Sequence, residues 1–275
     1  QIAADLSNAI SLTLLEKKEE TIAMTLHSEI RNFLRDPTLN SPQILLNQLL
    51  VIHEVYDLLV LFDVDGTLIL TNSAKRNHVK ELFPEEKIFL ARGKNLQDYI
   101  SDSKWLQNVS RGEFGYVGWH NSDLIRELYG DNQGDVAREY AIGFAAPVLD
   151  ARGAVLGGVL ALMNWQYIHK ILNKVEEDLQ ERSLTSGYPF MFGRDLNTVI
   201  GHKYRDNRDH IRDLADEENA LNNYGIRLEE DLGLGHIREE ILLGAANLRY
   251  EYPSGTKKIS GFSPVNHEFF QWMCG

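Results

Sequence analysis

The sequence predicts an α+β fold, in which a long N-terminal helix precedes two lobes that each contain an antiparallel sheet. Apolar residues first recur at helical spacing, and short apolar runs joined by Gly-, Asp- and Pro-rich turns follow. The pattern over Phe62–Asn72, an apolar strand, a polar turn and a second strand, returns over Phe192–His202. This loose internal duplication indicates two similar lobes.

The composition excludes several classes of protein. The chain has 275 residues, enough for one large domain or two ordinary ones. With 28 Lys and Arg against 40 Asp and Glu, the net charge of −12 disfavours nucleic acid and anionic membrane surfaces as partners. The only cysteine, Cys274, rules out an internal disulfide framework and a cysteine-rich metal site. We expect neither a cofactor nor a bound metal.

The first 50 residues are expected to form a helical spine. Apolar residues recur along it at Ile2, Leu6, Ile10, Leu14, Ile22, Leu26, Ile30 and Leu34. The pair Asp36-Pro37 marks a stop, because the residue before proline is pushed out of the α region. At 1.5 Å per residue such a helix spans about 50 Å. It could pack into one core, but its length favours a spine that lies beside two lobes. This spine could also pair with a second copy of the chain.

The elements that follow are assigned from periodicity and turn residues. We expect a first lobe at 51–166 and a second at 185–275, joined by a charged amphipathic helix at 167–184. Strands are expected at Leu58–Phe62, Thr67–Leu70, Tyr140–Val148, Val155–Met163, Phe190–Phe192, Asn197–His202, Leu248–Tyr252 and Lys257–Pro264, and a further helix at Leu96–Val109. Gly157 and Gly158 inside one strand indicate a close backbone approach.

The segment Leu59–Leu68, with Asp63 and Asp65 at its centre, resembles the first signature of haloacid-dehalogenase-type phosphatases. In that family the first Asp is the nucleophile, the second is a general acid or base, and Mg²⁺ shields the charge. The partners of that chemistry are missing, because Asn164 rather than Ser or Thr follows Val155–Met163 and no apolar strand ends in Asp-Asp or Gly-Asp. A hairpin turn explains the motif better, with the phosphatase as an alternative.

Three segments after the N-terminal helix together resemble the double Cache (dCache) extracytoplasmic sensor domains of bacterial chemoreceptors and sensor kinases. They are Leu61–Asn72, Ile142–Leu160 and Gly255–Val265, the last followed by Trp272. Ile142–Leu160 is similar to the family's stretch of apolar strand, Pro-Val, acidic turn and Leu-Gly-Gly-Val. Each segment alone is a common pattern. Together, however, the segments occur in the family's order and spacing, and the resemblance covers the whole chain.

The resemblance implies two PAS-like lobes, a membrane-distal one and a membrane-proximal one, in the periplasmic or extracellular part of a bacterial inner-membrane receptor. We expect both ends of the chain to be cut and a transmembrane helix to flank each of them in the full-length protein. The chain is expected to bind a ligand without catalysis. The output, a histidine kinase of a two-component system, a methyl-accepting chemotaxis protein or a cyclic-nucleotide enzyme, would lie outside it.

The resemblance places a small molecule in the distal lobe, between the helix before the third strand and the inner face of the sheet. The candidate ligand-binding residues are Tyr99, Trp105, Tyr116, Trp119, His120, Tyr140 and Asn164. Aromatic walls with a few polar groups suit a small ligand. Trp and Tyr also fill ordinary cores, and His120 also fits a surface histidine.

The resemblance also indicates which ligand to exclude. Amino-acid-binding members carry Arg, Tyr and Asp at three positions where this chain has Ser103, Leu106 and Asn164. We therefore expect an uncharged or carboxylate metabolite rather than an α-amino acid. The cations that could neutralise a carboxylate, or lie in solvent instead, are Lys104, Arg111, Arg126 and Arg138.

Two further interpretations concern the rest of the chain. His202, His210, Asp206 and Asp209 could be imagined as a metal cluster, but their spacing matches no strong ligand pattern, so we expect a solvated loop. The alternative to a sensor is a ligand-free structural module that forms a homodimer through the N-terminal helix, with side chains filling its pocket.

Overall fold

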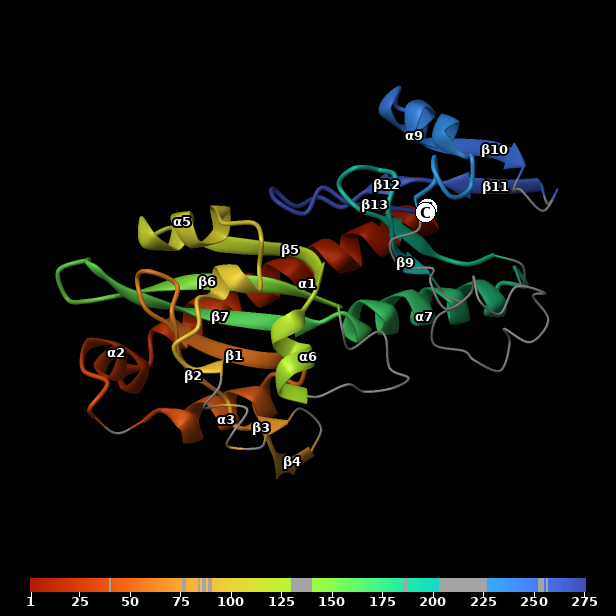
Figure 1. The fold of residues 1–275 in the computed structure, drawn as a ribbon. Coiled ribbons are helices and arrows are strands. Elements are labelled where there is room, and N and C mark those ends of the chain that lie inside the picture. The colour runs from red at the N-terminus through yellow and green to blue at the C-terminus, as the bar shows by residue number, and fades with distance from the viewer. Residues whose placement is uncertain are drawn as a thin grey trace. The chain divides into compact units, whose positions relative to one another are not determined.

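The α+β architecture is confirmed, with antiparallel pairing throughout the strands described (Figure 1). This computed structural model describes residues 1–39, 41–75, 78–83, 85, 88, 91–129, 140–184, 187–202, 227–251, 255 and 257–275. Contacts divide the chain into two compact units. Unit 1 comprises 1–15 and 166–275, and unit 2 comprises 16–165. No helix among the described residues is both long and apolar enough to cross a membrane.

The N-terminal region contains three helices: the predicted long N-terminal helix is present, but it is shorter than expected and two further helices follow it. The three are α1 (Ile2–Thr25), α2 (Ser28–Arg35) and α3 (Gln43–Ile52). The break falls at His27, whose backbone is extended with φ −64° and ψ 125°. Apolar residues at every fourth position drift around a straight helix by about 40° per repeat. One helix therefore cannot keep them all buried, and the break allows α2 to bury Ile30, Phe33 and Leu34 separately.

Unit 2 is built on a five-stranded sheet with the strand order β2-β1-β7-β6-β5. The strands are β1 (Tyr56–Phe62), β2 (Leu68–Thr71), β5 (Gly115–Asn121), β6 (Tyr140–Leu149) and β7 (Val155–Asn164). β1 is buried along its whole length, as expected for a strand covered on both faces. A small separate hairpin joins β3 (Ala74–Lys75) to β4 (His78–Leu82).

The predicted helix Leu96–Val109 is divided into two shorter helices, η1 (Leu96–Asp98) and α5 (Lys104–Ser110). Side chains at the start of each one explain the division. Asn95 Oδ1 accepts the Gln97 N–H at the beginning of η1 (2.9 Å), and Asp102 Oδ1 accepts the Lys104 N–H at the beginning of α5 (3.0 Å). Such polar side chains satisfy the free N–H groups of a new helix start.

The two faces of this sheet bury different elements. On one face, here called the α5–α6 face, α5 and α6 (Asp123–Tyr129) pack on apolar side chains of all five strands. Members of this core include Leu58, Phe62, Trp105, Val117, Leu124, Ala141, Leu160 and Leu162. The opposite face, here called the α1 face, meets the second half of α1, where Lys18 Nζ lies 5.8 Å from the ring centroid of Tyr116.

Unit 1 contains smaller sheets and its own apolar core. Its elements are α7 (Gln166–Glu181), β8 (Phe190–Phe192), β9 (Val199–His202), α9 (Gly235–Leu242), β10 (Asn247–Glu251), β11 (Lys257–Gly261), β12 (Ser263–Pro264) and β13 (Met273–Cys274). One sheet has the order β12-β13-β8-β9, and β10 with β11 forms a separate hairpin. The expected strand Lys257–Pro264 is therefore split, because Phe262 turns into the core beside Phe190 and Phe192.

Three hairpins of the chain share one turn chemistry. In each, a single Asp Oδ1 accepts two backbone N–H groups of the turn at 2.8–3.1 Å. The donors are Asp65 and Thr67 for Asp63, Arg152 and Ala154 for Asp150, and Asn197 and Thr198 for Asp195. The first and third turns belong to the two segments whose patterns are similar in the sequence. These segments are thus confirmed as hairpins, β1–β2 and β8–β9.

Candidate ligand-binding site

A row of side chains crosses the sheet of unit 2 at one end of its central strands. His120 of β5 pairs with Ala141 of β6, and Ala141 pairs with Asn164 of β7. Residues directly opposite each other in neighbouring strands lie on the same face of a sheet. Because Ala141 belongs to the core of the α5–α6 face, His120 and Asn164 lie on that face too. Asp57 of β1 completes this polar row through a hydrogen bond from Asn164 Nδ2.

Two β-bulges place the outer members of the polar row. The register of β5 against β6 shifts between Val117 and His120, and the register of β1 against β7 shifts between Tyr56 and Leu58. A bulge inserts one residue and re-aims the side chains that follow it. His120 therefore shares a face with Val117, although strict alternation would place the two on opposite faces.

The imidazole of His120 is half-buried. Its Nδ1 lies 2.8 Å from the carbonyl oxygen of Gly118. Nε2 is shielded from solvent and has no hydrogen-bond partner among the described residues. Burial lowers the pKa of His120. The carbonyls of Gly118 and Ala141 have the opposite, smaller effect on this pKa, because they favour the protonated ring. The ring is therefore neutral at pH 7.

At the other end of the row, Asp57 and Asn164 are almost fully excluded from solvent, with 2% and 0% of their surfaces exposed. The Asn164 backbone N–H donates to the Val55 carbonyl (2.9 Å), which fixes the end of β7. Tyr129, the last residue of α6, donates its OH to the Asp57 carbonyl at 3.2 Å. The end of α6 thus lies over this part of the sheet. The sequence gives no signal for Asp57, which sits inside an apolar run.

Trp105 of α5 is fully buried in the core of the α5–α6 face. Its ring meets Phe62 edge to face, with centroids 5.4 Å apart. Gly115 allows this packing, because a Cβ there would collide with the Trp105 backbone. The indole Nε1–H has no acceptor among the described residues. A buried donor without an acceptor is costly, by about 1–3 kcal/mol, so this N–H is a candidate contact for a ligand oxygen.

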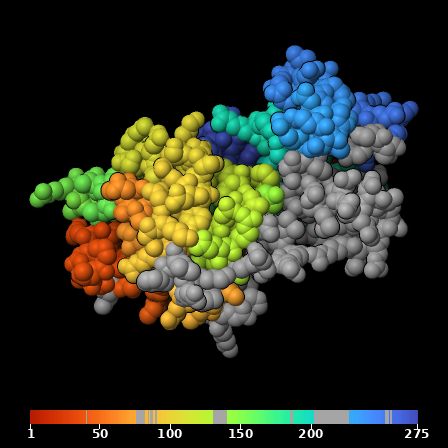
Figure 2. Space-filling view, viewed as in Figure 1, coloured from red at the N-terminus to blue at the C-terminus, as the bar shows by residue number. Residues whose placement is uncertain are grey.

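Tyr99 joins the rim of the same face through a small polar cluster. Its OH donates to Glu127 Oε2 (2.8 Å), and Lys94 Nζ lies 2.8 Å from Glu127 Oε1. Burial raises the pKa of Tyr99. Because Glu127 belongs to α6, the cluster ties this helix to the segment that contains η1. Figure 2 shows the stretch from η1 to α6, coloured yellow to yellow-green, as a continuous part of the surface of unit 2.

Three of the predicted residues lie on the opposite face. Tyr116 meets Phe144 and Lys18 on the α1 face. Tyr140 precedes Ala141 on β6, so its side chain points away from the polar row. Trp119 stacks on Tyr140, with ring centroids 4.5 Å apart and an interplanar angle of 4°. The structure therefore brings together Trp105, His120 and Asn164 with Tyr99 at the rim, and separates Tyr116, Trp119 and Tyr140 from them.

The cations considered for a ligand carboxylate are not found on the polar row. Lys104 and Arg111 are exposed, and Arg126 forms an ion pair with Asp123 one helical turn away. Arg138 lies outside the described residues. Lys17 is the only buried Lys or Arg among the residues that the structure describes, and it pairs with Glu20 of α1 at 2.6 Å.

The Asp63–Gly66 segment is a hairpin turn, as the sequence indicates. Gly66 has φ +83°, and Asp63 Oδ1 accepts the Thr67 N–H at 2.8 Å. β1, which carries Asp63 at its end, runs antiparallel to both neighbouring strands, whereas the phosphatase chemistry is expected on a parallel sheet. In the described part of the chain no group of three or more His, Cys, Asp or Glu could hold a metal. His210, Asp206 and Asp209 lie outside that part.

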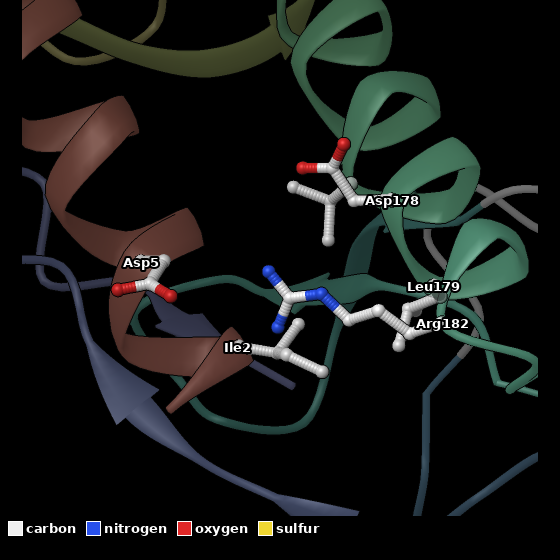
Figure 3. A pocket seen from close by; sticks show the side chains of 6 residues that line it. Ile2, Asp5, Asp178, Leu179 and Arg182 are labelled. Carbon is white, nitrogen blue, oxygen red and sulfur yellow. The ribbon is translucent and has the colours of Figure 1, made fainter.

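Unit 1 contains a small cavity between α1 and α7. Its lining residues are Ile2, Asp5, Val175, Asp178, Leu179 and Arg182. Figure 3 shows the Arg182 guanidinium extending from α7 toward Ile2 and Asp5. A volume of about 30 Å³ accommodates one or two water molecules, far less than the about 300 Å³ of a typical ligand site. This cavity is therefore not a metabolite site.

Comparison with solved structures identifies the fold. The chain superposes on the extracellular ligand binding receptor from Desulfohalobium retbaense with a TM-score of 0.53 and 12% identity, covering 98% of this chain and 38% of that one. It matches the ligand-binding domain of the Campylobacter jejuni chemoreceptor Tlp3, solved with 4-methylisoleucine, with a TM-score of 0.55 and 10% identity (99% and 87% covered). The extracellular domain assigned to a histidine kinase, mmHK1S-Z2, gives 0.56 and 12% (99% and 93% covered).

The chain has the fold expected for a double Cache sensor domain. The similarity extends over nearly its whole length, and it includes domains from both chemoreceptors and histidine kinases. The chain spans 38% of the length of the Desulfohalobium receptor, so that protein has further parts outside the match. No protein-family model and no curated protein sequence matches the chain.

Proposed function

We propose that this chain is the extracytoplasmic sensor region of a bacterial membrane receptor, and that unit 2 binds a small molecule on its α5–α6 face. The observation that carries the proposal is the unpaired, fully buried Nε1–H of Trp105, on a face that also holds the polar row. The fold shared with ligand-binding domains supports it. No catalytic step is assigned to these residues.

The ligand is proposed not to be an α-amino acid bound in the way that the family resemblance implies. Ser103 and Leu106 flank Trp105 where a guanidinium and a phenol are expected, and Asn164 replaces a carboxylate. Without the guanidinium, the ligand carboxylate loses a bidentate charge-assisted contact. Two structural neighbours are described as chemoreceptor domains in complex with L-leucine and L-Arg, so these are the informative negative probes.

The test is calorimetric titration with a metabolite panel that includes the common L-amino acids. A non-amino-acid compound should bind, and Trp105→Phe, which keeps a ring but removes the N–H, should weaken its binding by about 10-fold or more. Tyr140→Phe on the α1 face is the matched control and should leave the affinity unchanged. Tight binding of L-amino acids would contradict the proposed ligand class, and loss of affinity in the control alone would place the site on the other face.

Helix α1 is also proposed to pair with a second copy of the chain. Leu12 and Leu15 are 68% and 51% exposed, and they continue with Glu19 and Ile22 at alternating spacings of three and four. This is the spacing of a coiled-coil seam. Light scattering should give a dimer mass at high concentration, and Leu12→Glu with Leu15→Glu should give a monomer. A monomer for the unmodified chain at all concentrations would refute the pairing.

We also propose that ligand binding produces a signal by shifting the conformation of unit 2. A ligand that binds one conformation of unit 2 more tightly shifts the population toward it. The receptor's membrane anchors and its output domain would lie outside this chain.

A further inference from the structure

We infer that α6 is a lid over the α5–α6 face, and that it opens before a small molecule reaches the proposed site. This inference rests on the proposed function, because it adds a gating step to the same site. Trp105, whose N–H is the candidate ligand contact, has 0% of its surface exposed, and so has Ala141 in the middle of the polar row. A ligand therefore cannot enter this core unless an element that covers it moves.

The two covering helices differ in how they are attached to the sheet. Each has seven residues and buries three apolar side chains. The backbone of α5 lies directly against β5, β6 and β7, and a Cβ at Gly115 would lie 2.5 Å from the Trp105 carbonyl oxygen. α6 instead meets the core through the side chains of Leu124, Ile125 and Leu128. Because α5 is locked to the strands by this close approach, α6 is the element that can move.

The start of α6 provides a hinge. β5 ends at Asn121, and the buried Ser122 is the single residue between this strand and α6. Ser122 caps the helix, because its Oγ accepts the Ile125 N–H at 3.4 Å and its carbonyl accepts the Arg126 N–H at 3.1 Å. Asn121 still pairs with Tyr140 of β6. α6 can therefore swing about Ser122 while β5 stays in the sheet, since hinges are often a few residues at the end of an element.

Polar contacts fasten the second half of α6. Glu127 accepts the Tyr99 OH at 2.8 Å and pairs with Lys94 Nζ at 2.8 Å, so it joins α6 to the segment before α5. We call Glu127, Tyr99 and Lys94 the latch. The Lys94 and Glu127 side chains are 43% and 31% exposed, so water can replace their contact when α6 moves. Tyr129 adds a contact at the end of the helix, where its OH donates to the Asp57 carbonyl at 3.2 Å.

Thiol labelling measures the opening of α6 without a ligand. A cysteine replaces Ala141 or Ala145, two residues of β6 that are fully buried in the core of the same face. Ala141 lies in the row that the Tyr129 end of α6 covers, whereas Ala145 pairs with Gly115 beneath α5. Iodoacetamide is added to the full chain. Peptide mass spectrometry separates each label from that of Cys274, which is itself fully buried and reports on unit 1.

The lid predicts different rates at the two positions. Ala141→Cys should react at least about 10-fold faster than Ala145→Cys, because a local opening needs less free energy than unfolding of the whole unit. Glu127→Ala, which removes both latch contacts, should speed labelling at position 141 by about 10-fold and at position 145 by less than about 2-fold. Arg126→Ala is the matched control: its ion pair with Asp123 stays within α6, so both rates should remain within about 2-fold.

Hydrogen exchange of the Leu128 amide repeats the measurement without an introduced cysteine, and Glu127→Ala should speed this exchange by about 10-fold. Equal labelling at positions 141 and 145, or no effect of Glu127→Ala on labelling and exchange, would overturn the lid. Labelling as predicted, with no compound of the metabolite panel bound, would support the lid and refute the proposed ligand site. A compound whose affinity depends on Trp105, with an α6 that Glu127→Ala does not loosen, would do the reverse.

Discussion

The side chain of Asn72 satisfies backbone polar groups just after the end of β2. It is fully buried just after β2, and its Oδ1 accepts the Leu59 N–H of β1 at 2.7 Å. Its Nδ2 donates to the Ala74 carbonyl at 2.9 Å. The side chain thus takes the place of a ladder partner at the point where the chain leaves the sheet. Buried backbone groups need such a partner, because an unpaired one costs about 1–3 kcal/mol.

Replacing Asn72 by Leu should therefore destabilise the protein by about 2–4 kcal/mol, since two backbone groups lose their partners inside the core. Urea denaturation followed by circular dichroism measures this. Gln48→Leu, at an exposed position of α3, is the control and should change stability by less than about 0.5 kcal/mol. Equal effects of the two substitutions would show that the Asn72 hydrogen bonds contribute nothing.

Asp150 makes the stability of the β6–β7 hairpin depend on pH. The N–H groups of Ala154 and Arg152 lower the pKa of its carboxyl below the ordinary value. A lowered folded pKa gives stability that is present above about pH 4 and is lost as the pH falls through the folded value. Asp150→Asn keeps an acceptor but cannot titrate. The fall in melting temperature between about pH 4 and pH 2 should be smaller in this variant, and parallel curves for both proteins would contradict the assignment.

The residues of the candidate site were only partly predictable. Trp105 and Asn164 could be found because a motif resemblance points to their positions. His120 shares a face with Ala141 because of a bulge after Val117, and no sequence pattern reveals where a bulge falls. Trp119 would share the face of Val117 under strict alternation, yet it stacks on Tyr140 on the other side. The sequence does not reveal Asp57 as a site residue for the same reason, because the second bulge lies at Asp57 itself.

At the scale of elements, the hairpins were predictable and the helices less so. Each hairpin carries local chemistry, an Asp acceptor and a turn residue with positive φ such as Gly66 or Gly153. The N-terminal helix was predicted too long because its four-residue spacing looks continuous in the sequence. Only the packing of α2 shows that the apolar residues on the two sides of His27 need different faces.

The β1–β2 turn gives a test at this scale. Gly66 and Gly153 both have φ +83°, but a Cβ at Gly66 would lie 2.6 Å from Leu106 Cδ2, whereas nothing lies within 4 Å of a Cβ at Gly153. Gly153→Ala should cost about 1 kcal/mol from backbone strain alone. Gly66→Ala should cost about 1–3 kcal/mol more, because it also overpacks against α5. Thermal unfolding measures both, and equal losses would mean that α5 does not pack on this turn.

At the scale of the whole molecule, the two units differ in how the chain forms them. Unit 2 is one continuous segment, 16–165, whereas unit 1 is assembled from 1–15 and 166–275. A continuous segment with its own core can fold alone. The fragment 16–165 should therefore show a cooperative thermal transition and near-ultraviolet circular dichroism from its buried Trp105 and Trp165. A fragment without a cooperative transition would show that unit 2 requires the rest of the chain.

The central claim is that a small molecule binds on the α5–α6 face of unit 2, as proposed from its buried unpaired polar atoms and from a fold shared with ligand-binding domains. Hydrogen exchange with and without the tightest ligand of the metabolite panel tests it most directly. Protection should increase in α5, at the Asn121 end of β5 and at the Asn164 end of β7, with little change in β10 and β11. Protection confined to unit 1, or to the α1 face of the sheet, would contradict the account.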